Sequence, residues 1–485
     1  MSCVAAADAV LRDCPLLGRI RYRPATVWAM SSFSLFVDTF VYSLTVAMLP
    51  EMLQNKMKAP ESANGLVTSV FGLGSIVSCL AAGYASDKIR NRRTIQVLAS
   101  LVYVVAGGIF FVAGHFYQIL LFRLVNGVAS GVACTLSFTS MADVYPANLL
   151  GLKTAVVYLF NDAAYTIGPL CGERLYHMGG VRSPASVAIA LGLLRFVVYL
   201  VAADDSLVIR DRQSLLLLPL PPAHTPSQAD TSSEAGSSSM DKGQYHASGD
   251  CLDAVKEDYA DSSMSMWRLL RSPDVIIATL SIATGLGVQC MLEALVPLHL
   301  IDSLHRPDDN GITFVILGLT FTVLVSPVGK ATDVLIARSG EVMRHYMMLA
   351  GAGVMVLAAV VMSVAGSYAV LMTGFSVFAL ANLCMIIPAL SAYGDFVNGA
   401  NTNSMGRGYA ISGCAWATGI AVMPAIGSAL YARFGFTVPV VGVTLAMCAA
   451  SAAGFLAFII RDWIQRSGQT RHGSSPSEQP CEKST

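Results

Sequence analysis

The chain has 485 residues and equal numbers of acidic and basic side chains, so its formal net charge is zero. Charged residues make up only 13% of it and hydrophobic residues 54%, whereas a soluble domain carries about 25% charged residues. This composition excludes an ordinary soluble domain, and the balanced charge gives no reason to expect nucleic acid as a partner. We therefore expect an integral membrane protein that lies in the lipid bilayer.

Apolar runs of about 20 residues, each long enough to cross a bilayer as a helix, recur along nearly the whole chain. They predict an all-α, polytopic membrane protein with about twelve transmembrane helices in two six-helix bundles. In chain order the predicted spans are 27–50, 62–86, 94–114, 117–140, 151–178, 183–203, 274–299, 311–333, 344–364, 367–395, 405–431 and 436–461.

The central part of the chain interrupts this pattern. Between Pro219 and Asp261 the sequence is rich in Ser, Pro, Asp and Gly, and such a composition cannot bury enough apolar surface to fold alone. The expected domains are a cytoplasmic N-terminal segment (1–26), an N-terminal six-helix bundle (27–203), a disordered cytoplasmic linker (204–272), a C-terminal six-helix bundle (273–461) and a disordered cytoplasmic tail (462–485).

Basic residues are concentrated in alternate connections between the spans. They precede the first span, follow the second, flank the central linker and follow the last span. By the positive-inside rule all these segments lie in the cytoplasm, so both termini are expected there. The first apolar run is too long, and too far from the start, to be a cleaved signal peptide. The sequence leaves open whether the membrane is the plasma membrane or that of a vesicle or vacuole.

The chain offers little sign of cofactor chemistry. Most of its eleven cysteines fall in predicted spans, where we interpret them as small apolar side chains rather than as a disulfide framework. Neither a metal-ligand spacing nor a P-loop is present, so we expect no metal and no cofactor, and an ATP-driven pump is disfavoured. Nothing indicates an enzyme.

Two stretches about 245 residues apart carry the same signature, which indicates a duplicated bundle. Each places a glycine, an acid four residues later and basic residues at the cytoplasmic end of a hydrophobic span. An acid there is able to cap a neighbouring helix and pair with arginine, forming a latch that breaks as the bundles rock. Charges that only set the topology are the alternative, which the repetition disfavours. The motif residues are Gly83, Asp87, Arg92 and Arg93 in the first half and Gly329 and Asp333 in the second.

Acidic residues inside spans are costly, so they are candidates for function. Asp38 lies midway along the first span with no basic residue near it in sequence, so it is either protonated or holds a cation; a structural role is the alternative. Glu293 lies in the seventh span four residues before Pro297, unless it lies near the outer membrane surface. Asp395 lies in the tenth span or at its cytoplasmic end.

Two arginines and two aromatic residues complete the candidate set. Arg123 stands near the start of the fourth span, where it either acts in the site or extends to the membrane surface. Arg195 lies deeper, well inside the sixth span. Phe321 and Trp416 would line a central cavity and stack on a flat or cationic ligand, with ordinary helix packing as the alternative.

These motifs resemble those of the major facilitator superfamily. The stretch from Gly83 to Arg93 is similar to that superfamily's loop motif after the second helix, and the stretch from Arg123 to Gly131 to its fourth-helix motif. The segment Gly168-Pro169-Leu-Cys-Gly172 resembles the fifth-helix motif of its antiporters, a kink associated with exchange rather than symport. The resemblance spans all twelve predicted helices and implies the major facilitator fold.

Within the superfamily the chain looks most like the vesicular amine and acetylcholine transporters and related drug–proton antiporters. The segments around Asp38, from Met291 to Pro297 and from Pro388 to Asp395 are similar to segments of those proteins. Three positions depart from their pattern. Gly413 replaces an acid, Phe71 stands where a lysine is expected, and Arg195 stands where an acid is usual.

The resemblance implies a proton-coupled secondary active transporter, an antiporter that exports or sequesters a small organic compound, cationic or drug-like, by alternating access. Glu293 and Asp38 would bind substrate or proton, Asp395 would carry a proton, and Arg123 would couple the fourth span to them. Its partners would be the substrate and protons, and we expect a monomer. Two alternatives stay open: an exporter of an organic acid or neutral metabolite that uses Arg195, and a membrane sensor that does not transport.

Overall fold

The computed structural model describes residues 23–60, 62–88, 92–145, 147–201, 272–306, 309–399 and 405–472, and within these ranges the secondary structure is helical. The predicted linker (204–272) lies almost wholly outside the described residues, as do most of the N-terminal segment and the end of the tail. The long helices of the first half are α3 (Pro24–Leu44), α5 (Ser62–Lys88), α6 (Arg92–Phe111), α7 (Phe116–Val144), α8 (Ala147–Gly179) and α9 (Arg182–Val201).

The second half repeats the pattern with six further long helices. They are α13 (Pro273–Asp302), α14 (Asn310–Ser339), α15 (Met343–Ser363), α16 (Tyr368–Gly399), α17 (Met405–Phe434) and α18 (Thr444–His472). These twelve helices match the twelve predicted spans in order. Eleven of them are long and apolar enough to cross a membrane. The exception is α8, which carries Lys153, Asp162, Glu173 and Arg174 along its length.

Two predicted spans depart from a continuous α-helix in the structure. The first helix ends at Leu44, and after a turn the chain continues in α4 (Leu49–Glu51) and the π-helix η1 (Met52–Lys56). Pro50 lies in the first turn of α4, where its missing N–H costs no hydrogen bond. The last span begins with the π-helix η4 (Val438–Val443), again with a proline in its first turn. Its helix α18 runs on to His472, beyond the predicted end at residue 461.

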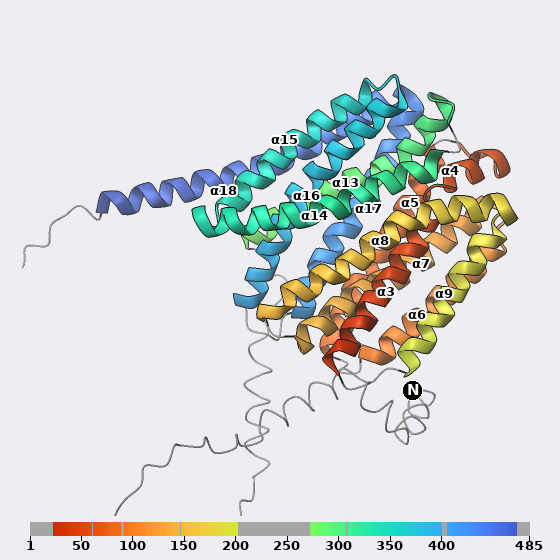
Figure 1. Ribbon diagram of the computed structural model, residues 1–485, viewed down its shortest axis with the longest axis horizontal. Coiled ribbons are helices and arrows are strands. Elements are labelled where there is room, and N and C mark those ends of the chain that lie inside the picture. Colours follow the sequence, from red (N-terminus) through yellow and green to blue (C-terminus); the bar gives the residue numbers. More distant parts are fainter. Residues whose placement is uncertain are drawn as a thin grey trace, which may run out of the picture.

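The helices form two groups, and the largest contacts between the groups are made by two pairs of helices. In Figure 1 the first half (red to yellow) and the second half (green to blue) lie on either side of the contacts of α5 with α17 and of α8 with α14. One side of the molecule holds the first residue of α3 and the last residue of α18. We call this side the near end; it is the expected cytoplasmic side. The opposite side is called the far end. The two groups are the bundles discussed below.

Small residues allow the bundles to touch. A β-carbon at Gly65 would collide with the backbone carbonyl of Pro424, and one at Gly318 with the side chain of Thr166. Helices that lack side chains at such positions approach closely enough for dispersion to hold them together without a hydrophobic driving force. Polar contacts add to this, since the Asn64 side-chain amide donates to the Ala294 carbonyl over 2.7 Å.

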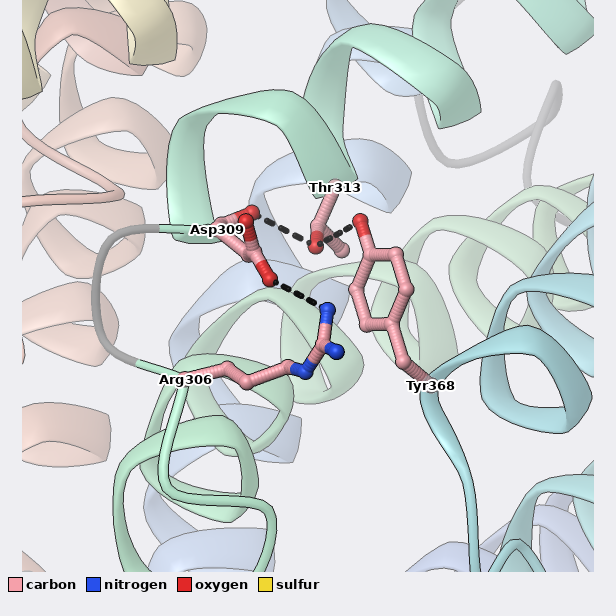
Figure 2. A network of polar contacts seen from close by, with 4 residues as sticks. All are labelled: Arg306, Asp309, Thr313 and Tyr368. Carbon is pink, nitrogen blue, oxygen red and sulfur yellow. Dashed lines mark hydrogen bonds and ion pairs between the residues drawn. The ribbon is translucent and has the colours of Figure 1, made fainter.

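A polar network closes the far end of the second bundle (Figure 2). The Arg306 guanidinium binds the Asp309 carboxylate at 3.0 Å and lies 5.4 Å from the centre of the Tyr368 ring. The Thr313 hydroxyl donates to the Asp309 carbonyl at 2.8 Å and lies 3.1 Å from the Tyr368 hydroxyl. The loop after α13 is thereby tied to the start of α16.

Candidate functional site

Glu293 lies on α13 of the second bundle, but its carboxylate is bound by tyrosines of the first bundle. Tyr42 on α3 donates to Oε2 at 2.9 Å, and Tyr165 on α8 donates to Oε1 at 2.6 Å. Gln289, one turn earlier on α13, donates to Oε1 at 3.2 Å and itself accepts from Asn382 on α16 at 2.9 Å. Glu293 is only 2% exposed, so its carboxylate is a buried junction of the two bundles.

Aromatic rings border this carboxylate. Phe71 on α5 packs on Tyr42 with ring centres 4.8 Å apart, and Trp416 on α17 meets Phe71 edge-on at 6.3 Å. Phe321, Tyr42, Tyr165 and Phe71 belong to one buried apolar cluster, and Trp416 packs against it. The predicted aromatic pair is therefore placed in the same cluster as Glu293's tyrosine partners. A carboxylate beside several rings suits an organic cation, because ring faces and the carboxylate both attract positive charge.

Arg123 lies on α7 beside the same site. Its guanidinium stands 5.3 Å from the centre of the Tyr42 ring, and its charge acts on Glu293. The side chain is fully buried, and none of its three guanidinium nitrogens has a hydrogen-bond partner among the described residues. A buried side chain of this kind does not extend to the membrane surface. Its open donors are available to a ligand or to water.

Asp38 and Arg195 both contact Tyr103 inside the first bundle. Asp38 accepts hydrogen bonds from the Tyr103 hydroxyl on α6 and from the Ser130 hydroxyl on α7, the latter at 2.9 Å. Arg195 on α9 stacks 4.8 Å from the Tyr103 ring centre, donates to Gln96 at 2.6 Å and acts electrostatically on Asp38. The sequence shows no basic residue near Asp38, and the fold supplies one from the sixth long helix.

The first copy of the repeated motif makes contacts at the near end. Arg92 forms an ion pair with Asp143 at the end of α7. Arg93 is buried and donates to the carbonyls of Tyr199 and Leu200, the last turn of α9. Cations at a helix C-terminus stabilise its free carbonyls and the negative end of its dipole.

The remaining motif positions differ in their surroundings. Gly83 is buried in α5, but the side chain of Asp87 lies outside the described part of the structure, as does that of Asp395. In the second copy the Asp333 side chain is exposed, and a β-carbon at Gly329 would meet nothing within 4 Å among the described residues. The two motif glycines therefore differ in their packing.

The segment from Gly168 to Gly172 packs α8 against α3. A β-carbon at Gly168 would collide with the Ser43 hydroxyl, and one at Gly172 with the Leu44 carbonyl. Pro169 lies inside α8 without ending the helix. The glycines thus face the point at which α3 ends, so that α8 and α3 touch through their backbones there.

Sequence reasoning missed the neutral partners of both acids. Tyr42, Tyr165 and Gln289 around Glu293, and Tyr103 around Asp38, carry no charge and attract no notice in an apolar chain. Two of them leave a local signal: Tyr42 follows Asp38 by four residues and Gln289 precedes Glu293 by four, spacings that place each pair on one helix face. The other two come from helices distant in sequence, so no local pattern marks them.

A polytopic helical protein with a buried polar site between two six-helix bundles has the architecture of a secondary transporter. The model of the Major Facilitator Superfamily matches residues 31–406, and the chain belongs to this family. This confirms the expected family and fold, and members of the family are transporters rather than enzymes.

Relatives and solved structures agree at low sequence identity. The chain is 24% identical over 178 residues to the MFS-type transporter ppzB of Metarhizium rileyi (36% of each chain). It is 22% identical over 173 residues to the quinolone resistance protein NorA of Staphylococcus aureus, covering 36% of this chain and 44% of NorA. The matched segments thus span less than half of these relatives' lengths.

The whole architecture is shared with solved transporters. The human organic anion transporter MFSD10 (TETRAN) superposes with a TM-score of 0.58 at 17% identity, over 89% of this chain and 99% of that one. The nucleoside transporter NupG, solved as a mutant, gives a TM-score of 0.57 at 12% identity, over the same shares of the two chains. At such identities these likenesses concern the fold and leave the substrate open.

Proposed function

We propose that the protein is a proton-coupled antiporter that exports or sequesters a small organic cation or drug-like compound, with Glu293 at its centre. The observation that carries the proposal is the position of this carboxylate: it belongs to one bundle and is bound by Tyr42 and Tyr165 of the other. Alternating access requires a site that both bundles share and whose state alters how they hold together.

The geometry supports competition between a proton and a cation at one carboxylate. An ionised Glu293 attracts a cation into the surrounding rings and holds both tyrosines by charge-assisted hydrogen bonds. A protonated Glu293 has no charge to offer the cation, and its bonds to the tyrosines are weaker. Binding of a proton thus favours release of the substrate cation and loosens the contact between the bundles, which is the coupling that exchange needs.

The near-end contacts of the first motif copy lie within one bundle. Arg92 pairs with Asp143 between α6 and α7, and we propose that this pair holds the near end of the first bundle in the shape that opening and closing require. The Arg92→Asp and Asp143→Arg single variants are expected to lower the transport rate, and the double variant to restore part of it. Two single variants that transport normally would remove the pair from the gating machinery.

A second candidate is supported by Arg123. If the substrate is an organic acid, the unpaired guanidinium beside Tyr42 is better placed to bind it than Arg195. Arg195 lies within the first bundle, bound to Gln96 and acting on Asp38.

The test is uptake into reconstituted vesicles driven by a pH gradient, with a panel of organic amines and organic acids. We expect amines to accumulate in vesicles with an acidic interior, and Glu293→Gln to abolish accumulation. Tyr431→Phe is the matched control, because it removes a tyrosine hydroxyl that binds Asp302 at 3.0 Å within one bundle. Transport of acids alone, or full activity of Glu293→Gln, would overturn the cation proposal and direct attention to Arg123.

A further inference from the structure

A row of polar side chains follows the contact between α3 and α7, which run in opposite directions through the first bundle. On α3 the polar residues are three or four positions apart, so they share one face of the helix. The facing residues of α7 continue the row. We call this set the α3–α7 seam; it consists of Ser31, Ser34, Asp38 and Tyr42 on α3 and Arg123, Asn126, Ser130 and Ser137 on α7.

Three contacts show that the two helices face each other along the seam. At the near end the Ser31 hydroxyl donates to the Ser137 carbonyl at 3.2 Å. In the middle the Ser130 hydroxyl donates to Asp38 at 2.9 Å. Toward the far end the Arg123 guanidinium lies 5.3 Å from the Tyr42 ring centre. The order of these contacts agrees with antiparallel packing and leads from the near end to Glu293, the partner of Tyr42.

Between these contacts the seam contains buried polar atoms with open hydrogen-bonding capacity. The hydroxyls of Ser34 and Ser137, both side-chain atoms of Asn126 and the Arg123 guanidinium are buried without a partner among the described residues. Buried polar groups in native proteins are almost always bonded to protein or to ordered water. Here they occur in a single row, so water that binds them would itself form a row.

The spacing fits water bridges. Residues three or four apart on a helix are displaced by about 4.5–6 Å along its axis, too far for a direct hydrogen bond and close to the span of one bridging water with two bonds of about 2.8 Å. Along the seam, Ser34 lies between Ser31 and Asp38, and Asn126 lies between Ser130 and Arg123. Each of these two gaps in the row therefore has a polar group available to hold a water.

The near end of the seam meets a cleft. This small cleft is lined by Ser31, Ser140, Gln96, Arg93 and Tyr199, with Val27 and Met30 as its apolar wall. Water that enters this cleft contacts Ser31, the first residue of the seam. The same cleft includes Gln96, the partner of Arg195.

The groups around Asp38 suit a site that takes up and releases a proton. Arg195 supplies a positive charge that stabilises the ionised carboxylate, and the Tyr103 and Ser130 hydroxyls bind it. The remaining titratable neighbours are the thiols of Cys79 and Cys134.

From these contacts we propose that the α3–α7 seam is a water-bridged proton path inside the first bundle, leading from the near-end cleft through Asp38 to Tyr42 and Glu293. A hydronium ion from the cleft passes its excess proton along the water row to the Asp38 carboxylate and leaves as water. For onward transfer Asp38 returns the proton to the next water, which protonates the Tyr42 oxygen as Tyr42 gives its own proton to Glu293. No other reactant is required, and each group except Glu293 ends in its starting state.

The path would separate the proton from the substrate. A proton that reaches Glu293 through the first bundle does not cross the contact between the bundles, where a substrate cation would lie. That the path serves transport rests on the proposed function. Whether the path exists is decided separately, by how fast the two carboxyl groups exchange protons with the near-end solvent.

The test follows hydrogen–deuterium exchange of the two carboxyl groups by infrared difference spectroscopy, on the full chain in lipid nanodiscs. The Asp38→Asn and Glu293→Gln variants assign the two carboxyl bands. Ser34→Val removes the polar group before Asp38, so proton exchange at both carboxyl groups is expected to slow about tenfold. Asn126→Leu removes the polar group after Asp38, so only proton exchange at Glu293 is expected to slow. Ser281→Val, a buried serine of α13 bonded to the Met385 carbonyl, is the control and is expected to change neither.

Three results would overturn the proposal: no carboxyl band assignable to Asp38, unchanged Asp38 exchange in Ser34→Val, or the same slowing in Ser281→Val as in the seam variants. Thermal unfolding shows which variants fold, and Ser137→Val serves if Ser34→Val does not. Uptake by the wild-type protein is measured in parallel. Wild-type protein that moves no substrate against a pH gradient refutes the proposed function, while the exchange rates still decide whether the path exists.

Discussion

Tyr42→Phe is the most direct test of the cross-bundle junction. Among the described residues Tyr42 is the donor to Glu293 Oε2, while Oε1 accepts from both Tyr165 and Gln289. Loss of the Tyr42 hydroxyl leaves one buried carboxylate oxygen without its donor, and the ring contacts with Phe71 and Arg123 remain. Hydrogen bonds to charged groups contribute about 1.5–3 kcal/mol. The bond exists only when the bundles are in this arrangement, so its loss destabilises this arrangement relative to others.

This free energy sets the expected population shift. Since about 1.4 kcal/mol corresponds to a factor of ten, Tyr42→Phe should change the equilibrium between bundle arrangements by about 10- to 100-fold. Tyr165→Phe should have a smaller effect, because Gln289 still donates to the same oxygen. In a protein whose conformations differ by a few kcal/mol, a shift of this size is visible as a new population.

The measurement is the distance between the bundles at the far end. Spin labels carried by an unnatural amino acid at Tyr117 and Phe434, which are 64% and 60% exposed, avoid the native cysteines. Pulsed electron spin resonance on the labelled chain should show a longer-distance population that grows in Tyr42→Phe. Tyr431→Phe removes a tyrosine–carboxylate bond within the second bundle and should leave the distances unchanged. Equal distributions in the two variants would refute the reasoning.

Two further predictions concern stability. Arg195→Met removes the positive charge that acts on buried Asp38, which should lower the free energy of unfolding. The thermal midpoint in detergent should fall, and it should recover in the double variant with Asp38→Asn. A single variant as stable as wild type would contradict this electrostatic coupling. Gly172→Ala pushes a β-carbon into the Leu44 carbonyl and should lower the free energy of unfolding by about 1–3 kcal/mol. Gly329 has open space around it, so Gly329→Ala should raise the free energy of unfolding by up to about 1 kcal/mol. Equal thermal midpoints for the two alanine variants would show that the α3–α8 contact is not tight.

The sequence by itself determined that this is a polytopic membrane protein and fixed the number and order of its long helices; it also predicted Asp38, Glu293 and Asp395 as the acids that function would use. Each of these depends on local composition: a helix spans a bilayer because its own residues are apolar and its own backbone satisfies its hydrogen bonds. The predicted helix ends agree less closely with the structure. The first span was predicted to reach residue 50, but its helix ends at Leu44. The cost of a charge in an apolar span likewise selects Asp38 and Glu293 without any knowledge of their neighbours.

Only the tertiary structure decided how these charges are satisfied. Tyr42 and Glu293 are 251 positions apart, and Asp38 and Tyr103 are 65 apart. The sequence placed Asp38 and Glu293 in one shared role, but the fold puts Asp38 with Arg195 inside one bundle and Glu293 between the two. The physical reason is that an apolar helix face fits against many others, so hydropathy does not specify which helices pack together. That choice is made by small residues that permit close approach and by polar groups that require a partner, and both act only when the helices meet.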